Sequence, residues 1–222
     1  HVTHAPGRPR LGVLLCVNGT GILYRWLRAL LGGTAGYDEL NGLAAGAPPG
    51  SDGLQVFPYG NGAERTLRNA GPGASVRGLD FNRHGRPHVL RAAQEGIVFA
   101  FQYGLGIMRG MGIVPEAVRA GQSNLFLSPL FGSTFATVTG CRVELYATDG
   151  AQGAARGAGV GAGVYAGPGE AFGGLTAVKT VEPDPAQAAE YAEACGRWTE
   201  LLERDLDVSP SGSSRSGASP AP

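Results

Sequence analysis

The chain has 222 residues, of which 18 are basic and 18 acidic, so its formal net charge at neutral pH is zero. This length is enough for one large domain or two small ones with a sizeable core, whereas zero net charge argues against binding to nucleic acid or a membrane surface through bulk charge. The three cysteines show no C-x-x-C spacing and no apolar run approaches the ~20 residues of a membrane span, so we expect a cytoplasmic protein with reduced thiols and no metal site.

The N-terminal part predicts a strand, a turn and a helix. Residues 11–17 are an apolar run typical of a buried strand, and Asn18-Gly19-Thr20-Gly21 predicts the turn. Apolar residues at helical spacing then predict a helix over residues 22–31, which ends at Gly32-Gly33. Such a turn can hold a ligand, but it is equally typical of a plain connection between a strand and a helix.

The next segment predicts short elements followed by one long helix. We expect a short helix over residues 37–43 and strands over residues 54–57 and 76–81. The adjacent Glu64-Arg65 pair is interpreted as a structural salt-bridge element rather than a catalytic one. Pro87 suits the first turn of a helix, and apolar residues from Leu90 to Met111 form a stripe along it.

The segment from Val118 to Tyr146 repeats the order of strand, turn and helix. The strand ends at Ala120, the turn is Gly121-Gln122-Ser123-Asn124, a helix is predicted over residues 125–140, and residues 142–146 alternate as a strand. A tight turn before a helix offers free N–H groups and the positive end of the helix dipole, which favours phosphate. Many such turns bind nothing, so the spacing alone leaves both interpretations open.

The C-terminal part carries a weak dinucleotide-binding pattern. Gly161-x-Gly163-x-x-Ala166 imitates the fingerprint of a Rossmann oxidoreductase, but it lies late in a helical pattern and follows no strand. Residues 185–206 predict an amphipathic helix. The residues from Val208 onward lack core-forming side chains and predict disorder.

Three segments in this order resemble the FGGY carbohydrate kinases, and among them the xylulokinases. They are Leu14–Leu27 (LLCVNGTGILYRWL), Phe57–Asn69 (FPYGNGAERTLRN) and Arg119–Tyr165, and the resemblance extends over residues 11–185. It implies an α/β fold, an actin-like (ribonuclease-H-like) ATPase lobe that forms the C-terminal domain of such a kinase. The implied organisation is a lobe lacking its first strands over residues 1–184, a C-terminal helix over residues 185–207 and a disordered tail over residues 208–222.

The resemblance also implies a nucleotide site built from two turns. Gly21 and Arg25 fall where a helix starts along the nucleotide phosphates, with Arg25 in place of the family's frequent Gln. The turn that matches the adenosine-binding turn consists of Gly121, Gln122, Ser123 and Asn124. This turn is one residue shorter than in glycerol kinases.

The catalytic base is not found in this chain. The family's Gly-Asp-Asn segment, which carries the catalytic Asp, and its Gly-Thr-Ser phosphate turn are expected upstream of residue 1. Asp149 is interpreted as a solvated loop residue. Phosphoryl transfer needs the γ-phosphate, Mg²⁺ and acceptor hydroxyl in line, with a carboxylate to take the proton.

The resemblance therefore implies an ATP- and Mg²⁺-dependent kinase that converts D-xylulose to D-xylulose 5-phosphate, of which this chain is the nucleotide-binding part, inactive alone. The sugar would bind through an N-terminal lobe that is missing here, and an exposed face between lobes could promote a homodimer. The alternative is a non-catalytic nucleotide-binding or interaction module derived from a sugar kinase.

Overall fold

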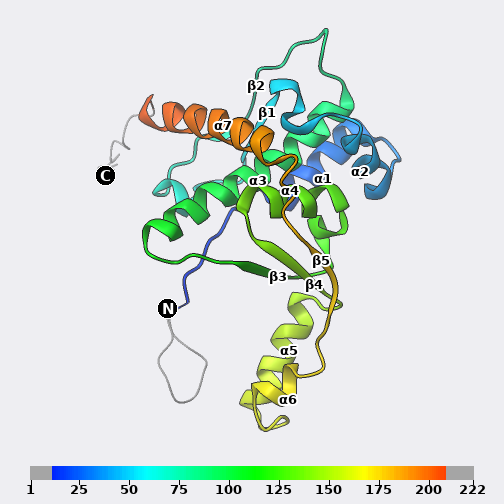
Figure 1. Ribbon diagram of the computed structural model, residues 1–222, viewed down its shortest axis with the longest axis vertical. Helices are drawn as coiled ribbons and strands as arrows, with labels where there is room; N and C mark the ends of the chain where they lie inside the picture. The colour runs from blue at the N-terminus through cyan, green and yellow to red at the C-terminus, as the bar shows by residue number, and fades with distance from the viewer. Residues whose placement is uncertain (1–11, 209–222) are drawn as a thin grey trace, which may run out of the picture.

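The computed structural model describes residues 12–208 of the chain (Figure 1). Its α-helices are α1 (Thr20–Leu27), α2 (Tyr37–Ala45), α3 (Arg86–Gly110), α4 (Pro129–Thr139), α5 (Gly150–Gly161), α6 (Pro168–Phe172) and α7 (Ala188–Val208). Its strands are β1 (Gln55–Tyr59), β2 (Gly73–Arg77), β3 (Ala117–Gly121), β4 (Arg142–Tyr146) and β5 (Ala177–Val181). Short 3₁₀ and π turns are η1 (Arg28–Gly32), η2 (Pro49–Gly53), η3 (Arg65–Leu67) and η4 (Asn124–Leu127).

The long helix α3 lies at the centre of the molecule (Figure 1). Pro87 occupies its first turn, where no N–H is needed, and the chain leaves the helix through Gly112 in the left-handed region. Helices α2, α4 and α7 and strand β1 all pack against α3. The middle of α3 is therefore buried all round, which explains why its apolar residues are not confined to one narrow stripe.

The strands form two small sheets. Strands β1 and β2 pair antiparallel, whereas the second sheet has the order β3-β4-β5, with β3 parallel and β5 antiparallel to β4. Because β3 and β4 are parallel, their carboxyl ends lie at the same edge, where the Gln122 N–H donates to the Tyr146 carbonyl at 2.8 Å. In residues 12–208 no strand pairs with the other edge of β3.

The core of the described residues consists of three hydrophobic clusters, each of which includes residues of α3, and α7 belongs to one of them. The Trp198 side chain of α7 is fully buried, stacks on Phe57 with ring centroids 4.9 Å apart, and donates from Nε1 to the Val56 carbonyl at 3.0 Å. These contacts join α7 to β1. Helices α5 and α6 instead pack on each other and project away from the core (Figure 1).

Several predicted elements are confirmed and several are wrong. The predicted helix over residues 37–43 and the strand over residues 142–146 are confirmed. The predicted strand over residues 76–81 is wrong beyond Arg77, because Gly78 turns the chain with a positive φ and Phe81 is almost fully exposed. The helix predicted over residues 125–140 is divided into η4 and α4, because Ser128 caps a new helix that starts at Pro129.

The predicted strand over residues 11–17 is also wrong where it can be assessed. Leu11 lies outside the described residues, and residues 12–17 run extended along α3 without pairing to a described strand, with Leu15 in contact with Gly104. Apolar sequence alone does not make a strand without a hydrogen-bonding neighbour. The predicted tail begins inside α7 at Val208, and its residues 209–222 lie outside the described residues.

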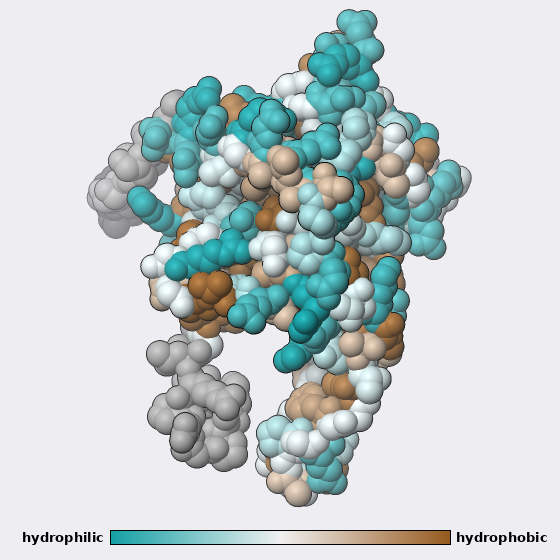
Figure 2. Space-filling model, viewed as in Figure 1, coloured by the Kyte–Doolittle hydropathy of each residue, from teal (hydrophilic) through white to brown (hydrophobic). Residues whose placement is uncertain are grey.

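A hydrophobic surface lies where the described chain begins, and Figure 2 shows it in brown. Its exposed side chains come from the N-terminal segment and from the end of α3 with the loop that follows: Val13, Leu14, Ile107, Met111 and Val114. Exposed apolar patches of this kind are typical of interaction surfaces. Within residues 12–208, no helix combines the length and the apolar character needed to cross a membrane.

Candidate nucleotide pocket

A pocket of about 270 Å³ brings together three segments that are far apart in sequence. Gly21 and Tyr24 of α1 line one side, Tyr37 and Asn41 of α2 line another, and the segment from Asn124 to Ser128 closes it. Its size lies just below the ~300–1,000 Å³ of typical small-molecule pockets, so it suits part of a ligand, such as a base. Two turns that the sequence singles out separately thus meet at one site.

Aromatic rings form the walls of this pocket. The rings of Tyr24 and Tyr37 stack with centroids 6.1 Å apart at 20°, and the Arg28 guanidinium lies 4.8 Å from the centroid of Tyr37. Burial raises the pKa of Tyr24 to about 12, so its hydroxyl stays protonated and acts as a donor at neutral pH. Flat apolar walls with a few polar groups favour a planar ligand.

Of the two phosphate-binding residues predicted on α1, Gly21 lines the pocket, whereas Arg25 is not among the lining residues. Gly21 lies in the first turn of α1, whose N-terminal Gly19 supplies no side-chain cap, so backbone N–H groups of this turn are free to donate. Arg25 follows one turn later, is exposed, and has no ion-pair partner among the described residues. The helix end and Arg25 together offer positive charge to an anion.

The residues of the second predicted turn, 121–124, do not contribute equally to the pocket. Asn124 lines the pocket in the left-handed conformation, with a φ of 52°, at the start of η4. Gln122 and Ser123 do not line the pocket, and their backbone N–H groups donate to the carbonyls of Tyr146 and Gly121 respectively. Gly121 is needed for packing, because a Cβ there would lie 2.3 Å from the Thr148 carbonyl oxygen.

A buried carboxylate positions the turn before α1. Glu64 is fully buried and accepts the Asn18 N–H on both carboxylate oxygens, at 3.0 and 3.2 Å, and the Asn18 side chain donates to the Ala63 carbonyl at 3.0 Å. None of the ion pairs among the described residues includes Glu64, so the expected salt-bridge role is wrong. Its role is instead to hold the Asn18–Gly21 turn in place.

Burial of Glu64 has a measurable pH signature. Burial raises the pKa of this carboxyl, and the Asn18 N–H bonds lower it only in part. The folded state therefore binds this proton more tightly than the unfolded state does, and protonated Glu64 adds to the free energy of unfolding. This contribution is fully present below the ordinary Glu pKa of ~4.3 and is lost as pH rises through the raised pKa of the folded state.

Urea unfolding of Glu64→Gln at a series of pH values from 4 to 8 should therefore show a smaller loss of stability with rising pH than the unmodified chain shows. Glu200→Gln, at an exposed position on α7, is the matched control and should leave the profile unchanged. Parallel profiles for Glu64→Gln and the unmodified chain would contradict the assignment.

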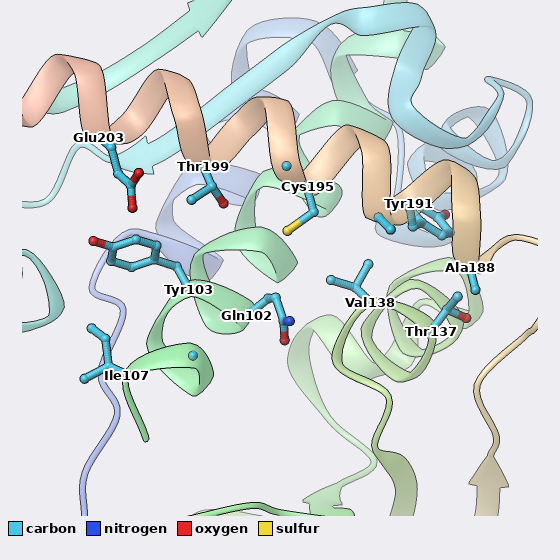
Figure 3. Close-up of a pocket in the computed structure, with 13 residues that line it drawn as sticks. Gln102, Tyr103, Ile107, Thr137, Val138, Ala188, Tyr191, Cys195, Thr199 and Glu203 are labelled. Atoms are coloured by element: carbon cyan, nitrogen blue, oxygen red, sulfur yellow. The ribbon is translucent and has the colours of Figure 1, made fainter. Parts of the chain in front are cut away.

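A larger hollow of about 710 Å³ lies between α3, α4 and α7 (Figure 3). Gln102 and Tyr103 face Cys195 and Glu203 across it, and none of the predicted site residues is present. Burial raises the pKa of the Cys195 thiol to about 11, which makes it a poor nucleophile at neutral pH. Glu203 is the charged side chain at its edge and disfavours phosphate, so this hollow does not suit a nucleotide.

Sequence reasoning did not find the pocket walls Tyr24, Tyr37 and Asn41. They lie on helices without any unusual motif, and only the packing of α1 and α2 against α3 brings them together. Among the described residues, no group of three or more His, Cys, Asp or Glu side chains is placed to hold a metal ion.

Comparisons with known proteins find similar sugar kinases. No protein-family model matches the chain. Over 82 residues it is 37% identical to a xylulose kinase of Haemophilus influenzae, and over 93 residues it is 37% identical to a gluconokinase of Bacillus subtilis; each match covers 37% of this chain and 16% and 18% of the relative, respectively.

Among solved structures, the xylulose kinase of Rhodospirillum rubrum matches with a TM-score of 0.69 and 28% identity. The match covers 83% of this chain and 38% of that protein. The chain thus spans less than two fifths of the length of each of these three proteins.

Proposed function

Because this chain is homologous to the FGGY carbohydrate kinases and has the fold of their C-terminal, actin-like ATPase lobe, we propose that it is the nucleotide-binding part of an ATP-dependent sugar kinase. The observation that carries the proposal is the meeting of Gly21 and Asn124, about a hundred residues apart in sequence, in one aromatic-walled pocket. The base would lie between α1, α2 and η4. The phosphates would extend toward the first turn of α1 and Arg25.

The arrangement supports binding and orientation of ATP. Free N–H groups at the α1 N-terminus and the Arg25 guanidinium would hold phosphate oxygens, and the tyrosine walls would fix the base. Mg²⁺ would supply charge neutralisation and would be held mainly by the nucleotide itself, since Mg²⁺ in such sites is bound by one or two carboxylates plus phosphates. We assign no catalytic base to the described residues.

For the acceptor we propose D-xylulose. The relative from H. influenzae and the structure from R. rubrum are both xylulose kinases, and gluconate is the alternative because the B. subtilis relative is a gluconokinase of equal identity. Acceptor binding and the catalytic base would come from the rest of the kinase, docked against the hydrophobic surface that includes Leu14, Met111 and Val114. Sugar-dependent ADP release by the 222-residue chain alone would contradict this division of roles.

Calorimetric titration with ATP and with adenosine tests the site. We expect Arg25→Ala to weaken ATP binding about tenfold or more while leaving adenosine binding unchanged, because a hydrogen bond to a charged group contributes about 1.5–3 kcal/mol. Asn124→Gly, which preserves the left-handed backbone, should weaken both ligands. Arg197→Ala, at an exposed position on α7, is the control. If the unmodified chain and the three variants all bound ATP equally, this placement of the site would be rejected.

A further inference from the structure

A chain of buried hydrogen bonds lies directly beneath the pocket and starts at the α4 N-terminus. The Phe131 N–H donates to Ser128 Oγ at 3.2 Å, and the Ser128 hydroxyl donates to Gln94 Oε1 at 3.0 Å. Gln94 is fully buried in α3, although Gln is mostly an exposed residue. With Oε1 accepting from Ser128, the Gln94 amide nitrogen must point the other way, toward the pocket.

The network then fixes the carboxamide of Asn41. Gln94 Nε2 donates to the Tyr24 hydroxyl at 2.7 Å and to Asn41 Oδ1 at 3.1 Å, while the Tyr24 hydroxyl donates to the same Oδ1 at 3.0 Å. A carbonyl oxygen has two acceptor sites, so both sites of Asn41 Oδ1 are filled. The Asn41 NH₂ group has no hydrogen-bond partner among the described residues.

The opposite orientation of the network is unfavourable. If the Gln94 amide were reversed, its NH₂ would donate to Ser128 Oγ, which already accepts from Phe131. The Ser128 hydroxyl hydrogen would then lose its acceptor, although Ser128 is only 3% exposed. A buried donor without a partner costs about 1–3 kcal/mol, so the network has one preferred direction.

We propose that Gln94 is a positioning residue that holds Asn41 with its NH₂ group directed to the ligand, so that the pocket selects a base offering a ring-nitrogen acceptor. This inference rests on the proposed nucleotide site and specifies how that site reads the base. Asn41 lines the pocket beside the stacked rings of Tyr24 and Tyr37. A purine held against these rings presents its N1, N3 or N7 to a donor in the plane of the base.

The test uses ATP and its 1-deaza, 3-deaza and 7-deaza analogues, in each of which one ring nitrogen becomes C–H. We expect the unmodified chain to bind one of the three analogues about 3- to 10-fold more weakly than ATP, which corresponds to one hydrogen bond. Gln94→Met should weaken ATP to the same degree and remove the discrimination against that analogue. Gln102→Met is the control, because Gln102 lies in the same helix but lines the larger hollow between α3, α4 and α7; this variant should bind ATP and its analogues as the unmodified chain does.

The outcomes separate this inference from the function on which it rests. If the unmodified chain binds ATP and all three analogues equally, or if Gln94→Met keeps the discrimination, the inference is overturned while the nucleotide site stands. If the unmodified chain binds no nucleotide, both are overturned. Asn41→Leu removes the same donor from α2 and should also abolish the discrimination, so the test holds even if Gln94→Met does not fold.

Discussion

Replacing Arg91 with methionine is expected to lower the free energy of unfolding by about 3–5 kcal/mol, because it removes one partner of a buried ion pair. Arg91 Nε and Glu95 Oε1 are 2.8 Å apart, and their side chains are only 5% and 2% exposed. The guanidinium also donates at 2.6 Å to the Ala47 carbonyl and to the Tyr191 hydroxyl. One side chain therefore joins α3 to the loop after α2 and to α7.

The loss is large because Glu95 stays behind. Burial raises the pKa of Glu95, and Arg91 is the main group that lowers it. Without Arg91, the carboxylate would keep only the Gly50 N–H and the Ser51 hydroxyl as donors. The variant should therefore be least stable at high pH, where Glu95 must be charged.

Urea unfolding at pH 5 and pH 8 measures both effects. The double variant Arg91→Met/Glu95→Leu is the control, because replacing a whole buried pair with apolar residues is often neutral or stabilising. We expect it to be more stable than the single variant at both pH values. A loss below ~1 kcal/mol in the single variant would mean that the pair behaves as a solvated one.

Replacing Gly96 with alanine is expected to destabilise the protein by about 1–3 kcal/mol or more, because it overpacks the contact between α3 and β1. A Cβ at Gly96 would lie 2.0 Å from the Val56 carbonyl oxygen and 3.0 Å from its carbon. Both are backbone atoms, so no side chain can rotate away. Displacing Val56 would also strain the bond that its carbonyl accepts from Trp198.

Gly106→Ala in the same helix is the matched control. A Cβ at Gly106 would meet nothing within 4 Å, so the change should stabilise the helix by up to ~1 kcal/mol through propensity alone. Thermal unfolding of both variants should thus give shifts of opposite sign. A stabilised Gly96→Ala variant would show that α3 can move away from β1 at little cost.

Local signals predicted much of the fold correctly. Pro87 and the apolar residues that follow it predicted the long helix, and alternation predicted the strand over residues 142–146. Strand β5 was missed because four of its five residues are exposed and it has no buried face to produce a pattern. The extended segment over residues 12–17 was misread because its apolar composition says nothing about a pairing partner.

The sequence by itself predicted the two turns that contain Gly21 and Asn124, because glycine and asparagine in turns before helices are local features of the chain, and the resemblance to the FGGY kinases then singled out these two residues. Only the tertiary structure decided that these two turns share a pocket, that Gly121 serves packing, and that Gln122 and Ser123 lie outside the lining. The physical reason is that a binding site depends on distances between segments, which periodicity along one segment does not encode. The buried network under the pocket depends in the same way on three helices meeting at Gln94, and a single glutamine in a helical sequence gives no sign of it.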